Sequence, residues 1–434
     1  MPDAVPADKQ SSSGVKNLRW WICTLLFLAT LINYLDRQTF AVATPAIVEE
    51  FSLSNDDVAN INIAFTSAYM IGQLVTGRFM DVLGTRAGFL IIMLFWSVSG
   101  MLCSTARGIV SLSVFRFLLG WGEAGNWPAS VKAISEWFPT RQRGLGVAYF
   151  SGGGSGLGAM IAPVVIAQLI LWTDWRWMFV IVGATGFLWA PLWLWFYRSP
   201  EKHWLMRRDE LDELRQEQSR KPESPQKQGV LAGWRSVLRY RQVWGVAFVR
   251  FFSDTILWFY LAWLPKYFVD ERGYEMEGIR DHLWIVFLPA IFASFLGGGI
   301  SGRLIERGWS VNRARKTVML VTGLMMMSSI GVGLVESDVT ALLLSSIALL
   351  SFYAYSTNTL TLPADLVSPR LVASVSGFSG MGAGLGSVLF TKLVGSIADT
   401  YSFTPVFILI GILPLLSLAS LFFVMGPIAR VVRD

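Results

Sequence analysis

The chain has 434 residues, of which 53% are hydrophobic and only 15% are charged. A water-soluble protein carries about a quarter charged residues, so this composition excludes an ordinary soluble domain. The net charge of +6 does not indicate nucleic-acid binding, because the basic residues stand in short gaps between apolar stretches. The few potential metal and redox ligands are too scattered for a metal site, a disulfide framework or a histidine-based catalytic centre: Cys23, Cys103, His203 and His282.

In chain order, residues 1–19 are polar and predict a disordered tail. Twelve apolar segments follow, each long enough for an α-helix of about 20 residues that crosses a bilayer. Such runs are too long for barrel strands, and in lipid only helices and closed barrels satisfy their backbone. We therefore predict an all-α integral membrane protein with transmembrane helices at about 20–44, 58–79, 87–106, 109–137, 144–171, 177–197, 242–265, 283–301, 317–334, 340–362, 371–397 and 403–425.

The long polar stretch 198–241 predicts a linker that carries a short amphipathic helix near 207–218. It separates an N-terminal six-helix half, 20–197, from a C-terminal half, 242–425, which a short tail, 426–434, follows. With the N-terminus in the cytoplasm, 26 of the 36 Lys and Arg residues fall on the cytoplasmic side and five on the other. This asymmetry predicts that both termini and the linker are cytoplasmic.

The two halves repeat weakly and in register. Residues 151–158 (SGGGSGLG) match 379–386 (SGMGAGLG), 228 positions later, and 77–81 (GRFMD) match 302–306 (GRLIE), 225 positions later. Six-helix repeats related by a pseudo-two-fold axis are typical of alternating-access transporters, in which the solute site lies between the halves near mid-membrane.

The loop after the second predicted helix is a candidate conformational gate. Gly77 would let helices approach closely, Asp81 could hold a neighbouring helix end or an arginine, and Arg86 follows as a basic residue. In the second copy Glu306 replaces the aspartate and the next glycine is missing. The alternative is an ordinary charged turn.

Charged residues within predicted transmembrane helices are expensive and are functional candidates. In the first helix Tyr34 and Arg37 share a face, and an arginine offers a forked donor that suits a carboxylate. Asp36 beside them is a candidate proton acceptor. The alternative is a fixed structural contact between Asp36 and Arg37.

The fourth helix carries Arg116 and Glu123, two turns apart on one face. A carboxylate near an arginine loses that partner when a substrate anion takes the arginine, and it then binds a proton. This would couple protons to an anion. The alternative is a structural buried ion pair.

The seventh helix carries Arg250 and Asp254, four residues apart. An intrahelical pair and a second anion contact from Arg250 are both consistent with this spacing. Tyr69 and Asn358 offer a hydroxyl and an amide at membrane depth, and Ser379 begins the second glycine-rich repeat. These three complete the predicted substrate-binding residues.

Several motifs resemble a known family. The loop 77–86 resembles the signature loop of the major facilitator superfamily. Residues 34–37 (YLDR), Arg116 with Glu123, and 135–139 (SEWFP) with the following arginines resemble its anion:cation symporter family. Three stretches are most similar to bacterial hexuronate transporters: 81–85 (DVLGT), 158–163 (GAMIAP) and 241–245 (RQVWG).

The resemblance implies proton-coupled uptake of a small organic anion, such as a hexuronate, across the bacterial cytoplasmic membrane. It implies that Arg37 binds the substrate carboxylate, that Asp36 and Glu123 carry the proton, and that Arg116 switches partners. Tyr34 and Tyr69 would line the site. We expect no cofactor besides the coupling protons, no nucleic-acid partner, and a monomer.

Other functions remain open from the residues alone. A symporter for another small carboxylate, such as an aromatic or hydroxy acid, is the first alternative. A multidrug exporter is less favoured, because the position of Pro163 and the site arginines do not suit export of a lipophilic cation. A non-transporting sensor would need an appended domain, and a membrane enzyme would need a nucleophile–base set or metal ligands, neither of which the sequence shows.

Overall fold

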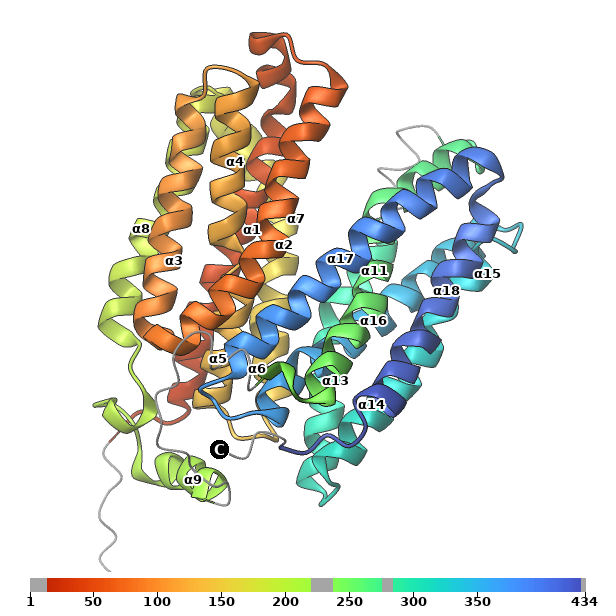
Figure 1. Ribbon diagram of the computed structural model, residues 1–434. Helices are drawn as coiled ribbons and strands as arrows, with labels where there is room; N and C mark the ends of the chain where they lie inside the picture. The colour runs from red at the N-terminus through yellow and green to blue at the C-terminus, as the bar shows by residue number, and fades with distance from the viewer. Residues whose placement is uncertain (1–13, 220–236, 275–283, 431–434) are drawn as a thin grey trace, which may run out of the picture.

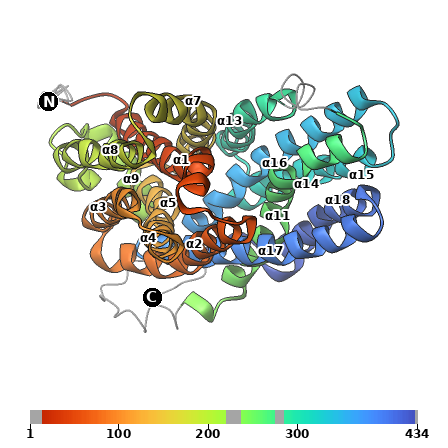
Figure 2. The same ribbon diagram turned by 90° about the horizontal axis from the view of Figure 1, so that it is seen from above.

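The computed structural model describes residues 14–219, 237–274 and 284–430. Within these ranges every regular element is a helix, and the helices form two bundles that lie side by side (Figures 1 and 2). The first 13 residues of the predicted tail and residues 220–236 of the predicted linker lie outside the described residues. The prediction of an all-α membrane fold is confirmed.

The N-terminal bundle contains eight α-helices, one π-helical segment and a short 3₁₀ helix, η1 (Cys103–Thr105). Two of the predicted spans are interrupted at glycine: α4 and α5 are separated at Gly125, and the glycine-rich η2 lies between α6 and α7. The elements are α1 (Leu18–Phe51), α2 (Asn55–Leu83), α3 (Thr85–Leu102), α4 (Ile109–Glu123), α5 (Asn126–Trp137), α6 (Arg143–Ala148), η2 (Tyr149–Ser155), α7 (Gly156–Trp172) and α8 (Trp175–Phe196).

The C-terminal bundle begins with α11, which bends by 47° between Leu261 and Trp263. Pro265 follows at the position where its missing N–H leaves the carbonyl of residue 261 without a helical partner, which accounts for the bend. The elements are α11 (Arg241–Asp270), α13 (Trp284–Glu306), α14 (Val311–Met326), α15 (Ser329–Val332), α16 (Asp338–Leu366), α17 (Val372–Thr400), α18 (Phe403–Ala419) and the π-helical η4 (Ser420–Val424).

Nine helices among the described residues are long and apolar enough to cross a membrane, and the two arms of bent α11 make ten. The other two predicted spans fall on the broken pairs α4–α5 and α14–α15, whose separate pieces are shorter. The chain is a multi-pass membrane protein, and the number twelve stays a prediction.

Among the contacts between the bundles are two close helix crossings, α2 with α17 and α6 with α13. At each crossing glycine meets backbone: a methyl group on Gly77 would overlap the carbonyl of Ala373, and one on Gly298 would overlap the carbonyl of Gly144. These glycines therefore permit backbone contact between the halves. The bundles diverge from this end toward the opposite one (Figure 1).

The linker contributes a helix at the same end, α9 (Arg208–Ser219). It confirms the prediction of a short helix near 207–218. Its acidic residues contact the N-terminal half: Glu213 pairs with Arg19 at 3.0 Å and with Arg141 at 2.5 Å. We call this end, where α9 and the two crossings lie, the closed end.

Candidate functional site

A cavity of about 610 Å³ lies between the two halves, and both halves contribute to its walls. Its lining is mostly aromatic and hydroxyl-bearing. Three charged side chains line it among the described residues, Arg37 from α1 and Arg250 and Asp254 from α11. The other polar and aromatic lining residues include Tyr34, Asn62, Thr66, Tyr69, Gln73, Trp127, Ser151, Ser155, Trp258, Tyr353, Ser356 and Thr357.

Arg37 presents its guanidinium at the N-terminal wall. The group lies 4.6 Å from the centre of the Tyr69 ring and 5.2 Å from that of Tyr34, so two aromatic faces hold it. Its Nε donates to Glu123 at 3.2 Å, and an Nη atom donates to Asn33 at 3.2 Å. The side chain is 19% exposed and its carboxylate partner is fully buried. Arg37 is therefore the accessible member of a buried ion pair.

The predicted proton-coupling residues lie behind this wall. Glu123 accepts from Arg37 through one oxygen, while its other oxygen has no hydrogen-bond partner in the described part of the chain. Asp36 accepts from the indole of Trp96 at 3.1 Å. Neither carboxyl group lines the cavity as the structure describes it. A ligand would therefore act on Glu123 through Arg37.

The structure assigns Glu123 a different ion partner from the one expected. The sequence suggested a pair of Arg116 and Glu123, whereas in the structure Glu123 forms its ion pair with Arg37. The guanidinium of Arg116 instead lies over the Phe65 ring at 4.2 Å, and its Nε and Nη1 have no hydrogen-bond partner among the described residues. Two turns of α4 separate Arg116 from Glu123, whereas Arg37 approaches from the neighbouring helix.

On the C-terminal wall Arg250 and Asp254 form the intrahelical pair that their spacing allows, with contacts of 3.0 and 2.9 Å. Ser253 donates to the second oxygen of Asp254 at 3.0 Å, and Arg250 donates to Ser379 at 3.3 Å. Ser379 thus supports Arg250 from behind and is absent from the described lining. Charge is balanced locally on this wall.

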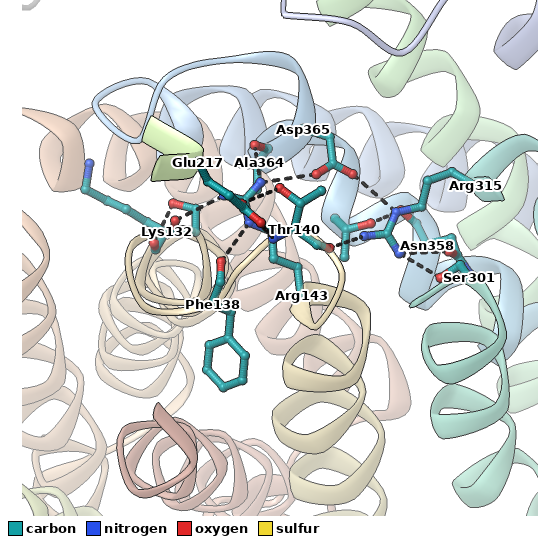
Figure 3. Close-up of polar contacts among 12 residues, drawn as sticks. Lys132, Phe138, Thr140, Arg143, Glu217, Ser301, Arg315, Asn358, Ala364 and Asp365 are labelled. Atoms are coloured by element: carbon teal, nitrogen blue, oxygen red, sulfur yellow. Dashed lines mark hydrogen bonds and ion pairs between the residues drawn. The ribbon is translucent and has the colours of Figure 1, made fainter. Parts of the chain in front are cut away.

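Asn358 lies away from the cavity lining. Its amide nitrogen donates to the carbonyls of Gly297 and Ala354, and its oxygen accepts from Arg315 at 3.2 Å (Figure 3). In this conformation the structure places it in the polar network of the closed end, outside the cavity lining. Its predicted role in binding stays a prediction.

The closed end holds an ion network that joins the halves (Figure 3). Asp365 of α16 accepts from Arg143 of the N-terminal half and from Arg315 of its own half, each at 3.2 Å. Arg143 also donates to the carbonyl of Ala364 at 2.9 Å, and Arg315 reaches the carbonyl of Thr140 at 3.4 Å. Each arginine therefore crosses to the opposite half.

Asp81 forms a second link between the halves. It accepts from Lys132 at 2.7 Å within its own half. It also accepts from the backbone N–H and the hydroxyl of Ser374, at 2.7 and 2.6 Å, where α17 begins. Free N–H groups at a helix N-terminus favour a carboxylate, so Asp81 fastens α17 to α2. The geometry fits the predicted gate.

Of the other two predicted gate residues, Arg86 bonds within its own half and Glu306 lies at the junction of the halves. Arg86 donates to the carbonyl of Leu194 in α8 at 2.5 Å, within its own half. Glu306 is half exposed and lies 3.9 Å from Arg141 of the opposite half, so this exposed ion pair also crosses between the halves. The repeat placed Glu306 by analogy with Asp81, but its longer side chain stands at an exposed helix end and holds no helix N-terminus in the described structure.

Sequence reasoning did not single out Asp365 and Arg315, and it used Arg143 only as part of a motif. One signal was present, since Asp365 follows Pro363 near the end of a long apolar segment and Arg315 begins another. Pairing across the halves needed the tertiary structure. No group of three or more His, Cys, Asp or Glu residues that could hold a metal occurs among the described residues.

Comparison with known proteins identifies the family of this chain. Residues 26–391 match the model of the Major Facilitator Superfamily, so the chain belongs to this family of membrane transporters and is not an enzyme. It is 34% identical to a hexuronate transporter of Escherichia coli (strain K12) over 404 residues, 93% of each chain. It is 31% identical to a galacturonate transporter of Dickeya chrysanthemi over 330 residues, 76% of this chain and 94% of the relative.

Among solved structures, the crystal structure of the superfamily transporter FucP in the outward conformation matches with a TM-score of 0.73. The match covers 94% of this chain and 99% of FucP at 15% sequence identity, so it supports the fold alone.

Proposed function

We propose that this transporter is a proton symporter that takes up a hexuronate, or a closely related sugar acid, by alternating access. The observation that carries the proposal is the pair of Arg37 and Glu123. Its guanidinium lines the cavity while its carboxylate is buried. The relatives named as hexuronate and galacturonate transporters support the substrate class.

The pair provides a route to coupling. A substrate carboxylate that enters the cavity can bind the guanidinium fork of Arg37 in two-pronged geometry. Glu123 would then lose its ion partner in a buried environment, where an unpaired carboxylate is costly and the protonated form is favoured. Binding of the anion and binding of a proton thereby support each other, and Asp36 extends the acceptor set on the same wall.

The rest of the cavity suits a sugar acid. A hexuronate has one carboxylate and several hydroxyl groups, and Tyr353, Ser356 and Thr357 line the C-terminal wall opposite Arg37. The flat faces of Trp127 and Trp258 can pack against the apolar faces of a sugar ring. The cavity thus offers Arg37 to the one carboxylate of a hexuronate and several hydroxyl side chains to its hydroxyl groups.

Alternating access requires the closed end to open while the other end closes. The bonds of Asp81 and Asp365 between the halves would break in that step, and both are short-range polar contacts that can re-form. We propose that the closed end faces the cytoplasm, together with both termini, in the bacterial inner membrane, and that the monomer is the transporting unit.

The test is uptake of radiolabelled galacturonate and glucuronate into proteoliposomes, with and without an inward proton gradient. We expect accumulation that depends on the gradient. Arg37→Ala should lower uptake at least about a hundredfold, because it removes the charged anchor and leaves Glu123 unpaired. Glu123→Gln should abolish accumulation and retain exchange of internal for external substrate.

The matched control is Arg107→Ala, which removes an exposed arginine between α3 and α4 and should leave uptake near the wild-type rate. Uptake that is indifferent to the gradient would overturn symport. Failure of the wild type to transport either acid would overturn the hexuronate assignment.

A small aromatic carboxylate is the second candidate, because Trp127, Trp258 and Phe352 line the cavity together. Competition separates the two. If benzoate or hydroxybenzoate inhibits galacturonate uptake no better than acetate does, the aromatic lining serves the sugar ring. Inhibition and uptake of the aromatic acid at lower concentrations than galacturonate would favour the second candidate.

A further inference from the structure

The C-terminal wall of the cavity contains a cation that is already neutralised. Arg250 is bound by Asp254 through two nitrogen atoms, and Ser253 and Ser379 satisfy further atoms of the pair. Both side chains line the cavity, with 10% and 13% of their surfaces exposed. Arg37 on the opposite wall is the lining cation that a ligand carboxylate can take, and its own partner is buried out of the ligand's reach.

We infer that Asp254 is a specificity-determining residue, which rejects a second carboxylate at the far end of the substrate. The inference rests on the proposed function and deepens it. A six-carbon uronic acid has one carboxylate, whereas the hexaric acid of the same length has one at each end. With Asp254 in place, the far end of the cavity offers a negative oxygen as well as a guanidinium, which suits hydroxyl groups and repels an anion.

The spacing of the two walls supports this division of roles. Along α2, Tyr69 contacts Arg37, and Gln73, one turn further, lies against Gly380 beside the Arg250 guanidinium. One helical turn rises about 5.4 Å. The ends of an extended six-carbon chain lie roughly 6 Å apart, by the reach of a chain of single bonds. The two positions on α2 are thus separated by about the length of such a chain, which supports an acid group at Arg37 with the other end of the molecule directed toward the Arg250–Asp254 pair.

Variants that change the net charge of the Arg250–Asp254 pair test the inference. The pair is neutral in the wild type, Asp254→Asn leaves Arg250 with a net positive charge, and the double variant Arg250→Gln/Asp254→Asn is neutral again. Asp270→Asn is the matched control. Asp270 forms an ion pair at 2.6 Å with Lys266, four residues earlier on the same helix. Both side chains are at least 40% exposed and lie outside the cavity lining.

The measurement is the ratio of galactarate to galacturonate uptake by each protein in proteoliposomes. We expect Asp254→Asn to raise this ratio at least about tenfold, since repulsion of a second carboxylate becomes attraction. The double variant and Asp270→Asn should keep a ratio within about twofold of the wild type. An unchanged ratio in a folded, active Asp254→Asn protein would show that the pair is structural and would overturn the inference.

A second measurement needs no variant. In the wild type, the monoamide of galactaric acid should inhibit galacturonate uptake at a concentration at least about tenfold lower than galactaric acid itself, because the amide removes the second charge and keeps its shape. Equal inhibition by both would overturn the inference while leaving the hexuronate assignment intact. Failure of the wild type to transport galacturonate would overturn the proposed function, and this inference with it.

Discussion

At the closed end, the arginines that link the halves meet a carboxylate and backbone carbonyls together, as Arg143 and Arg315 do around Asp365. In the cavity, Arg37 meets one buried carboxylate on one side and the cavity on the other. The arginines of the closed end thus have their hydrogen-bonding groups bound within the protein, whereas Arg37 has a guanidinium that is accessible from the cavity. We interpret the first group as stabilising one conformation and the second as available to bind a ligand.

The largest expected effect comes from Asp365→Asn. The change leaves Arg143 and Arg315 buried without their shared anion, and breaking such a buried pair typically costs about 3–5 kcal/mol. We expect a lower thermal unfolding midpoint in detergent. Glu123→Gln is the matched change in the cavity, and it should cost under about 1.5 kcal/mol, because Arg37 is partly exposed and keeps its bond to Asn33. Equal losses of stability in the two variants would contradict the contrast between the closed end and the cavity.

Asp81→Asn should rank second, at about 2–3 kcal/mol, because the carboxylate bonds to Lys132 and to the first N–H groups of α17. It should also let a thiol reagent applied from the closed end reach a cysteine placed at Ser356 in the cavity lining. Ser374→Ala removes one hydroxyl bond to Asp81 and should show about a third of the loss. Unchanged labelling would contradict a gating role for Asp81.

The glycine crossing offers a pair of neighbours that differ in space. A methyl group on Gly298 would overlap the carbonyl of Gly144 in the other half, whereas one on Gly299 would meet its nearest atom at 3.5 Å, an ordinary contact. Gly298→Ala should therefore destabilise the closed end by about 1–3 kcal/mol. Gly299→Ala should be neutral or stabilising by up to about 1 kcal/mol through helix propensity. Thermal unfolding and thiol labelling check both.

The smallest effect concerns α9. Glu217 accepts from the backbone N–H and the hydroxyl of Thr140, each at 3.0 Å, and Thr140 in turn accepts from Arg315 across the halves. Glu217→Gln should weaken this docking by about 1 kcal/mol or less. Faster hydrogen exchange of the α9 amides, with little change in unfolding midpoint, is the expected result. A large loss of transport would mean that α9 belongs to the gate.

The amino-acid sequence by itself determined that this chain is a helical membrane protein built from two related halves, because length and apolarity decide which segments can cross a bilayer. It also singled out Arg37, Glu123 and Asp36, since charge at membrane depth is too costly to be incidental, and Asp81 through the glycine and charge pattern of its loop. The spacing of Arg250 and Asp254 was enough to predict their pair, because residues four apart on a helix are neighbours.

Only the tertiary structure decided which charges on different helices meet. Arg37 and Glu123 are 86 residues apart, and Arg143 and Asp365 are 222 apart, so no periodicity in the sequence relates them. Asn358 is polar at membrane depth like a ligand contact, yet packing turns it toward Arg315. A local pattern fixes which face of a helix is polar, whereas the partner on that face depends on how the helices pack, and that is a property of the whole fold.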